Sequence, residues 1–382
     1  MKFMFVTPAY RPSFFEGAKG GGEISNQILL EALAQKGFKV YVISMVPVMQ
    51  EAVYRDGHIR VIEPFSIFKG KALAAILSLV FFKNALSRLL VRVKPNVALS
   101  STSVIKVTTE VCKANGVRHG GMVRAMENMP GYGWKWNPRS PASLVKFALH
   151  KATIGWPGGR ELDDVDFIVA NSEFLKAKYL SEFPGKPACV VYPALAIEKS
   201  NKPLPEVIRR VMMVGTSYAK GFDIFKELAS KFPDLEFHAI GDRNLQGQET
   251  RRDGNVIVHG WMSNPIPFID KMDLVLVPSR WEEPFGRISV EAIYRNKFVL
   301  VSGMGGLPET VDNDEAYIVF SHNKESWENK LEKLLIELES YGSRYSILQC
   351  AVNNFSLGKQ VEIFHEFLIN SDEIFKDNKY ER

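Results

Sequence analysis

Glu283 and Glu291, with seven residues between them, are the acidic residues whose surroundings best suit ligand chemistry. The apolar stretch 273–278 predicts a buried strand, and the loop after it carries Glu283 and Gly286. A helix is expected to begin near residue 287, and its first N–H groups favour a phosphate. Because carboxylates accept hydrogen bonds from hydroxyl groups, two of them on either side of a diphosphate suit a sugar and a ribose. The alternative is an ordinary helix start with solvated glutamates.

Lys220 and a run of glycines are the next candidates. Lys220 lies between an expected strand and an expected helix, where its ammonium can offset charge on a departing diphosphate; otherwise it is a solvated lysine. The glycines at 20–22 precede another helix and offer bare amides to a phosphate, although such glycines also form plain turns. The run is neither GxGxxG nor GxxxxGK(S/T), which disfavours a nicotinamide or ATP site. The candidate ligand-binding residues are Gly21, Gly22, Gly215, Thr216, Lys220, Arg280, Phe285, Gly286, Arg287, Ile288 and Glu291.

The elements that position these residues form two series of alternating strands and helices. In the first series, a strand at 2–8, a helix at 24–36 and a strand at 40–46 make a βαβ unit, which implies a parallel sheet. Further strands of this sheet are expected at 97–99, 119–123 and 167–170. The second series has strands at 210–214, 236–240, 256–259, 273–278 and 298–301, with helices at 222–231 and 288–294.

The proline-rich stretch 187–205 is the expected linker between two domains. The sequence therefore predicts an α/β protein of two Rossmann-like, doubly wound domains, residues 1–200 and 205–355. Two such domains are expected to face each other across a ligand cleft at the carboxyl ends of their strands.

The same motifs resemble those of the retaining GT-B glycosyltransferases of family 4, the glycosyl transferases group 1. The resemblance covers most of the chain, and its motifs lie at 20–23, 214–221, 239–242, 258–261, 283–291 and 303–309. It implies that the N-terminal domain binds an acceptor and that the C-terminal domain binds a nucleotide-diphosphate sugar, the donor substrate. It also implies that helices at about 356–382 pack back on the N-terminal domain. The implied reaction moves a hexosyl unit to an acceptor hydroxyl with retention at the anomeric carbon.

The resemblance assigns roles to single residues. Glu283 would hold hydroxyls of the transferred sugar, and Glu291 would hold the ribose. Lys220, Gly21 and Gly22 would stabilise the diphosphate. No metal cofactor is expected, because amides and cations take over its role.

One departure from the family pattern concerns the diphosphate. Thr216 follows Gly215 where relatives commonly have an arginine that helps to hold phosphate. Arg280 or Arg287 is the expected substitute.

A second departure concerns the reacting sugar. Many relatives place a histidine after a strand of the N-terminal domain, and here Arg124, Glu127 or Asn128 stands in that region. His119 lies too early, inside the expected strand, and is interpreted as structural. The candidate catalytic residues are Glu283, Lys220, Arg124 and Glu127.

Two segments suggest how an acceptor is bound. The loop 129–141 carries Tyr132, Trp134 and Trp136, which either stack on acceptor sugars or pack on their own domain. Residues 68–94 combine the apolar run 72–82 with six Lys and Arg residues, and no acid occurs from 64 to 109. This segment is either a helix that lies on an anionic membrane or a core helix with a solvated basic face.

Composition and charge narrow the function classes. The 382 residues are 46% hydrophobic and 24% charged, which excludes a disordered or fibrous chain. The net charge of +5 divides into +11 for residues 1–200 (26 Lys+Arg, 15 Asp+Glu) and −6 for 201–382 (22 and 28), as two domains with different partners would have. The basic half carries no nucleic-acid-binding motif, so nucleic acid is not an expected partner. The three cysteines lack metal-site spacing and are expected to be buried thiols.

The expected location is the cytoplasm, with peripheral contact at the inner face of the plasma membrane. The first residues do not resemble a signal peptide, and no stretch is long and apolar enough to span a bilayer. The expected pathway is surface polysaccharide or lipopolysaccharide assembly, and the acceptor is a sugar or a lipid-linked sugar. The alternatives are a nucleotide-sugar epimerase of similar architecture and a catalytically inactive scaffold in a polysaccharide complex.

Overall fold

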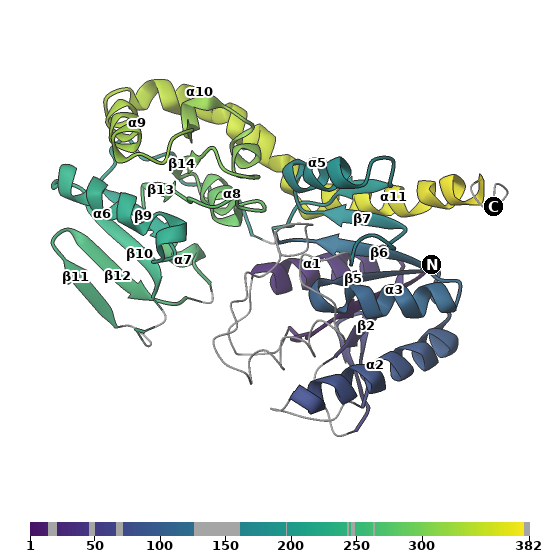
Figure 1. Ribbon diagram of the computed structural model, residues 1–382. Helices are drawn as coiled ribbons and strands as arrows, with labels where there is room; N and C mark the ends of the chain where they lie inside the picture. The colour runs from purple at the N-terminus through teal and green to yellow at the C-terminus, as the bar shows by residue number, and fades with distance from the viewer. Residues whose placement is uncertain are drawn as a thin grey trace. The chain divides into compact units, whose positions relative to one another are not determined.

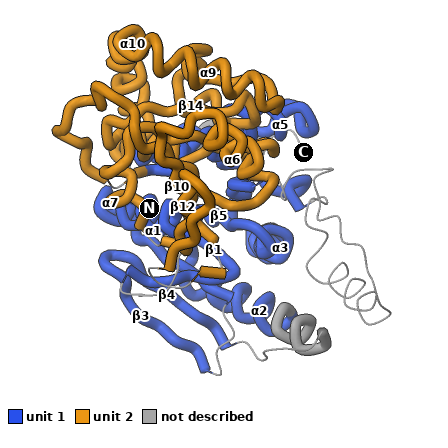
Figure 2. Tube along the Cα trace, turned by 90° about the vertical axis from the view of Figure 1, so that its left-hand side faces the viewer, with its two compact units in different colours: residues 1–194, 360–382 blue, residues 195–359 orange. Residues whose placement is uncertain are grey.

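The computed structural model divides into two compact units, which Figure 2 colours separately: Met1–Ala194 with Gln360–Arg382, and Leu195–Lys359. The corresponding sequence-based ranges were 1–200 with helices from about 356, and 205–355. The structure describes residues 1–13, 21–45, 50–65, 72–125, 161–195, 197–242, 244–245, 249–262 and 264–377; the side chains of 72–79 and 371–377 are left aside.

The first unit contains an eight-stranded sheet of order β3-β4-β2-β1-β5-β6-β7-β8, in which only β3 pairs antiparallel. Its strands are β1 (Lys2–Thr7), β2 (Lys39–Ser44), β3 (Ala52–Asp56), β4 (Ile59–Glu63), β5 (Val97–Ser101), β6 (Arg118–Val123), β7 (Phe167–Ala170) and β8 (Ala188–Val190). Its described helices include α1 (Gly21–Gln35), α2 (Ala72–Val93), α3 (Ile105–Ala114) and α5 (Glu173–Glu182).

Alternate residues of β1 face opposite sides of this sheet, as the two-residue period of a strand requires. Met4 and Val6 pack into a buried cluster with side chains of α2 and α3. Phe3 faces the other side, where its ring meets Phe364 edge-on at 5.8 Å between centroids. The first sheet is therefore covered on both faces, which explains why its central strands are apolar throughout.

The C-terminal helix α11 (Leu357–Asp377) begins in the second unit and then packs on the first (Figure 1). Its Phe367 packs against Phe167 of β7 at 5.4 Å between centroids. Arg118 of β6 donates a hydrogen bond to the Leu368 carbonyl at 3.1 Å. These contacts make most of α11 part of the first unit.

The second unit contains a seven-stranded sheet of order β11-β12-β10-β9-β13-β14-β15, in which only β11 pairs antiparallel. Its strands are β9 (Arg210–Val214), β10 (Glu236–Asp242), β11 (Thr250–Asp253), β12 (Val256–Gly260), β13 (Leu274–Val277), β14 (Phe298–Ser302) and β15 (Ile318–Val319). Its described helices are α6 (Phe222–Lys231), α7 (Ile266–Ile269), α8 (Arg287–Tyr294), α9 (Lys324–Ile336) and α10 (Leu338–Ala351). Helices pack against this sheet through aromatic side chains. For example, Phe225 of α6 packs against Phe237 of β10, with 5.0 Å between the ring centroids.

One sequence-based expectation is wrong, one is right only in part, and one pair of strands was missed. The boundary between the two units, between Ala194 and Leu195, lies within the expected linker 187–205, but residues 188–190 form β8 and complete the sheet of the first unit. The hairpin β3–β4 was not expected, since an edge strand such as β3 is half exposed and lacks a continuous apolar run. Cys112 and Cys189 are buried as expected, but Cys350 is exposed on the outer side of α10.

Among the helices that the structure describes, none combines the length and the apolar character needed to cross a bilayer.

His119 on β6 is a buried structural residue, and it should make the stability of the protein depend on pH. Its ring nitrogens meet the hydroxyls of Ser100 at 2.7 Å and Thr109 at 3.0 Å. Burial lowers the pKa of His119 to about 3. The unfolded chain takes up the proton near pH 6.5, so between these values the unfolded state binds more protons and stability falls as the pH falls. We expect a loss of about 2 kcal/mol from this residue between pH 7.5 and pH 5.

Urea unfolding of the wild type and of His119→Gln at pH 7.5, 6 and 5 measures this contribution. The free energy of unfolding of the variant should decline less steeply with acid by that amount. His58→Gln is the control, because the His58 side chain is 70% exposed and should not change the slope. Parallel pH dependences for the wild type and His119→Gln would contradict the prediction.

Candidate functional site

The loops that follow β9 and β13 meet at the carboxyl edge of the second sheet. Both strands are parallel and adjacent, so their ends lie side by side. The Arg280 N–H donates to the Ala219 carbonyl at 2.9 Å and ties the two loops together. Gly221 has φ +79°, and a Cβ there would lie 2.0 Å from the Pro278 carbonyl oxygen. A glycine is therefore required where the segment carrying Lys220 crosses the end of β13.

This crossing brings Lys220 and Glu283 into direct contact. The Lys220 ammonium forms an ion pair with Oε1 of Glu283, which is only 6% exposed. Oε1 also accepts hydrogen bonds from Ser279 Oγ at 2.7 Å and Trp281 Nε1 at 2.9 Å. The Lys220 ammonium lies 5.2 Å from the centre of the Trp281 ring, within reach of a cation–π interaction. One oxygen of the candidate catalytic carboxylate thus receives three donors.

Helix α8 begins at Arg287, at the end of the loop that carries Glu283. Its N-cap is Gly286, at φ +106°, where a Cβ would lie 2.3 Å from Leu307. A glycine cap has no side chain to accept the first N–H groups of the helix. The helix start therefore presents donors and a partial positive charge at the same edge as Lys220.

Glu291 lies one turn into α8 and is buried. Its Oε1 accepts a hydrogen bond from Arg287 Nη2 at 2.8 Å. Burial raises the pKa of Glu291, and the Arg287 guanidinium opposes this shift. Arg287, one of the two proposed substitutes for the family arginine, is thus held by Glu291.

The loop after β14 packs on the Glu283 backbone. Gly306 N–H donates to the Glu283 carbonyl at 2.7 Å, and Gly305 pairs with Glu283 in an isolated β-bridge. The segments 283–291 and 303–309, separate motifs in the sequence, therefore form one structural unit.

Of four other candidate residues of this unit, Arg280, Phe285 and Gly215 have partners of their own. Arg280 forms a bidentate ion pair with Asp223 (2.7 and 3.2 Å) and stacks over Tyr218. Burial alone would raise the pKa of Asp223, but the Arg280 guanidinium holds it below its usual value. Phe285 is buried and packs against Phe355. The Gly215 N–H donates to the Ile240 carbonyl at 2.8 Å, and the next residue, Thr216, is half-buried.

The Phe285 side chain is therefore part of the core. The N–H of Gly215 is also already used, because it donates to the Ile240 carbonyl at the sheet edge. Both findings have one cause: a motif identifies a segment, whereas the tertiary contacts of that segment decide which of its groups are already used.

The remaining candidate residues belong to the first unit and are described there. Gly21 and Gly22 were expected just before a helix, but they form the first turn of α1; their contact with a diphosphate stays a prediction. Arg124 directly follows β6 and is half-buried; its Nε donates to Met122 Sδ at 3.0 Å. Glu127, Asn128 and the loop 129–141 with its aromatic residues lie outside the described residues.

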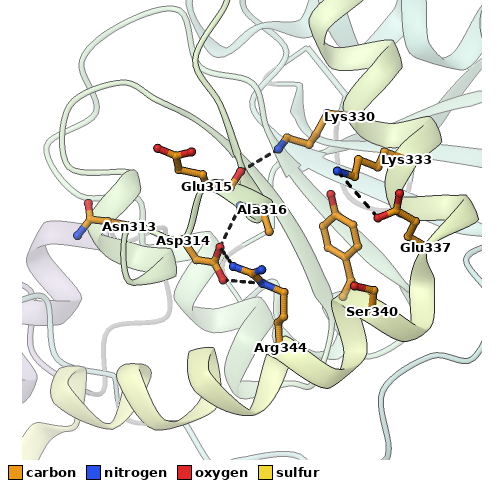
Figure 3. Close-up of a pocket in the computed structure, with 10 residues that line it drawn as sticks. Asn313, Asp314, Glu315, Ala316, Lys330, Lys333, Glu337, Ser340 and Arg344 are labelled. Carbon is orange, nitrogen blue, oxygen red and sulfur yellow. Dashed lines mark hydrogen bonds and ion pairs between the residues drawn. The ribbon is translucent and has the colours of Figure 1, made fainter.

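A separate pocket of about 640 Å³ lies at the other end of the second sheet, where 313–316 lead into β15 (Figure 3). Its cations are already partnered: Lys330 by the Glu315 carbonyl at 2.8 Å, and Arg344 by Asp314 at 2.6 Å. Because its charges neutralise one another and it lies at the amino end of the strands, this pocket does not carry the predicted diphosphate chemistry.

Sequence analysis missed three residues of the second-unit site: Ser279, Trp281 and Asp223. Ser279 and Trp281 stand four and two residues before Glu283, inside the motif itself, so their polar hydrogens were a usable signal. Asp223 had no local signal, because its partner Arg280 is 57 residues away.

A family model and a curated relative match this chain. Residues 198–343, most of the second unit, match the family model described as Glycosyl transferases group 1. A Klebsiella pneumoniae protein described as an uncharacterized 42.6 kDa protein in the cps region is 28% identical over 341 residues, which are 81% of this chain and 87% of that protein.

Solved structures share the fold over nearly the whole chain. The lipopolysaccharide outer core galactosyltransferase WaaB in its apo form superposes with a TM-score of 0.68 at 13% identity, covering 97% of this chain and 100% of that one. Anabaena Alr3699/HepE in complex with UDP-glucose superposes with a TM-score of 0.64 at 16% identity, again covering 97% and 100%. At these identities the likeness establishes the α/β architecture of two doubly wound domains.

Proposed function

We propose that this chain, a group 1 glycosyltransferase with the GT-B fold, moves a hexosyl unit from a nucleoside-diphosphate sugar to an acceptor hydroxyl with retention at the anomeric carbon. The observation that carries the proposal is the contact between Lys220 and Glu283 beside the start of α8. It joins a cation, a carboxylate and helix N–H groups at one sheet edge, which is the set that a sugar diphosphate requires. The resemblance of the segment 283–291 to that of the retaining family 4 glycosyltransferases supports retention.

Each group has a defined task in this proposal. When the bond between the sugar and the diphosphate breaks, negative charge grows on the leaving phosphate oxygen. Lys220 and the first N–H groups of α8 stabilise that charge, because they are fixed before the reaction begins. Glu283 accepts hydrogen bonds from the sugar hydroxyls, and Glu291 accepts them from the ribose. These roles need no metal ion, since the cation and the helix start neutralise the diphosphate.

The relatives favour a nucleotide-sugar donor and an acceptor in surface-polysaccharide or lipopolysaccharide assembly. One similar structure holds UDP-glucose, another is a lipopolysaccharide galactosyltransferase, and the Klebsiella relative is described by its cps region. We propose that the second unit binds this donor and that the first unit binds the acceptor.

Incubation with radiolabelled nucleotide sugars, with and without membrane lipid extract, tests the proposed function. A glycosyltransferase transfers label only when an acceptor is present, an epimerase yields an epimeric sugar without acceptor, and an inactive scaffold gives no product. A thermal-shift screen selects the donor first, because a ligand at 100 times its dissociation constant adds about 2.7 kcal/mol of stability. Proton NMR of the product anomer then distinguishes retention from inversion. Glu283→Gln is the matched control for background hydrolysis.

The exposed side of α2 is the surface that we propose for peripheral contact with an anionic membrane. Its other side is core, since Phe82 and Leu86 are fully buried. Val80 is 52% exposed and Phe81 37% exposed. Phe81 lines a pocket of about 510 Å³ together with Phe65, Arg88 and Arg92. Glu51 also lines this pocket and pairs with Arg92 at 3.0 Å. Apolar side chains beside arginines suit an acidic lipid surface.

We expect the protein to sediment with anionic vesicles and to be released by high salt, because surface charge attraction is screened within about 8 Å at physiological ionic strength. Arg88→Ala should weaken vesicle binding about fivefold, since each basic residue near such a surface contributes about 1 kcal/mol. Lys113→Ala is the control, because Lys113 is an exposed lysine of α3 that lies outside this pocket. Equal sedimentation with neutral and anionic vesicles, or none with either, would contradict the membrane proposal.

A further inference from the structure

The two oxygens of the Glu283 carboxylate have unequal surroundings. Oε1 receives Lys220 Nζ, Ser279 Oγ and Trp281 Nε1. Among the described residues, no donor lies within hydrogen-bonding distance of Oε2. A carboxylate offers about four acceptor positions, so the side on Oε1 is saturated and the side on Oε2 is available to a ligand hydroxyl.

Trp281 contacts both members of the ion pair. Its indole N–H donates to Glu283, and its ring face lies beneath the Lys220 ammonium. Ser279, which is 1% exposed, supplies a second neutral donor from the same loop. These two donors differ from Lys220 in one respect: they carry no charge that a bound diphosphate would attract.

We propose that Trp281 and Ser279 are positioning residues that hold the Glu283 carboxylate while Lys220 is shared with a bound diphosphate. The inference rests on the proposed function and deepens its account of the same site. When phosphate oxygens attract the ammonium, Oε1 still receives two hydrogen bonds, so the carboxylate keeps its orientation and Oε2 stays directed at the sugar. The Trp281 ring also limits where the ammonium can move.

Two single variants separate these contacts. Trp281→Phe removes the indole N–H but keeps an aromatic face beneath Lys220, and Ser279→Ala removes the hydroxyl. We expect each variant to lower turnover about tenfold, as the loss of one hydrogen bond to a charged group does. The dissociation constant of the nucleoside diphosphate, measured by calorimetry, should stay within about twofold, because neither donor touches the nucleotide.

The separation between turnover and nucleotide affinity is the readout that a merely structural role would not produce, because general destabilisation of the loop would change both. Ser279→Thr keeps the hydroxyl and should restore the wild-type turnover. Ser302→Ala is the matched control: Ser302 Oγ donates to the Ser279 carbonyl at 2.8 Å, so this variant perturbs the same loop without touching the carboxylate. It should lower thermal stability and leave turnover unchanged.

The possible outcomes are distinct. If the wild type transfers sugar and Trp281→Phe, with an unchanged unfolding transition, has the same turnover, this inference is wrong and the proposed function stands. If the variants lose nucleotide affinity in proportion to turnover, the two residues bind the donor and do not position Glu283. If the wild type transfers no sugar from any nucleotide sugar, the proposed function fails and the inference fails with it.

Discussion

Replacing Lys220 with alanine is expected to lower turnover about a hundredfold, with a much smaller change in the dissociation constant of the nucleoside diphosphate. The reason is that the ammonium interacts most strongly where charge grows, on the phosphate oxygen that leaves the sugar. Removing one such fixed donor typically raises the barrier by about 3 kcal/mol. The structure places this cation in a defined position, since it is paired with Glu283 and lies over Trp281.

Steady-state kinetics with saturating donor, combined with calorimetric titration of the nucleotide alone, measures both quantities for Lys220→Ala. Lys226→Ala is the matched control, because Lys226 is an exposed lysine on the adjoining helix α6 and should behave as the wild type. Lys220→Arg keeps the charge and should recover part of the lost turnover. A folded Lys220→Ala protein with wild-type turnover would remove Lys220 from the mechanism.

Glu283→Gln is expected to lower turnover about a hundredfold while nucleotide affinity stays near that of the wild type. Glutamine keeps the shape of the side chain but cannot accept three donors on one uncharged oxygen as strongly as a carboxylate does. The proposed ligand of Glu283 is the transferred sugar, whose geometry and charge change during the reaction. Loss of an interaction that strengthens in the transition state appears in turnover.

Glu291→Ala is expected to weaken binding of the donor, in contrast to the loss of turnover expected for Glu283→Gln. The ribose does not change during the reaction, so losing a hydrogen bond to it removes binding that ground state and transition state share. We expect the donor Michaelis constant and the dissociation constant of the nucleoside diphosphate to rise about thirtyfold, as a loss of about 2 kcal/mol implies. The structure adds a cost to stability, because the variant leaves the Arg287 guanidinium without its carboxylate partner.

Glu291→Gln therefore accompanies Glu291→Ala, since an amide retains a hydrogen bond with Arg287 and preserves the fold. Calorimetric titration of each variant with the nucleotide alone decides between the two roles. Loss of nucleotide affinity in Glu283→Gln and its retention in both Glu291 variants would reverse the assignment. If neither position affects binding or transfer, the segment is only a helix start, and the proposed function loses its main support.

The sequence predicted the strands and helices that surround the second-unit site with small errors at their ends. The expected helix at 288–294 is α8 (Arg287–Tyr294), and the expected strand at 210–214 is β9. These elements have strong local signals: continuous apolar runs for strands buried on both faces, and a glycine at the helix start. The weakest signals belonged to exposed or short elements, such as β3 at the sheet edge and the two-residue β15.

The sequence by itself determined which segments form the site, because each motif is local: an apolar strand, a glycine and the polar residues after it. Only the tertiary structure decided which groups within those segments are available to a ligand. It pairs Lys220 with Glu283 across 63 residues and Arg280 with Asp223 across 57, and it buries the Phe285 side chain. It also saturates one oxygen of Glu283. Such contacts depend on the order of parallel strands in the sheet, which brings distant loops to one edge and which no local pattern of residues encodes.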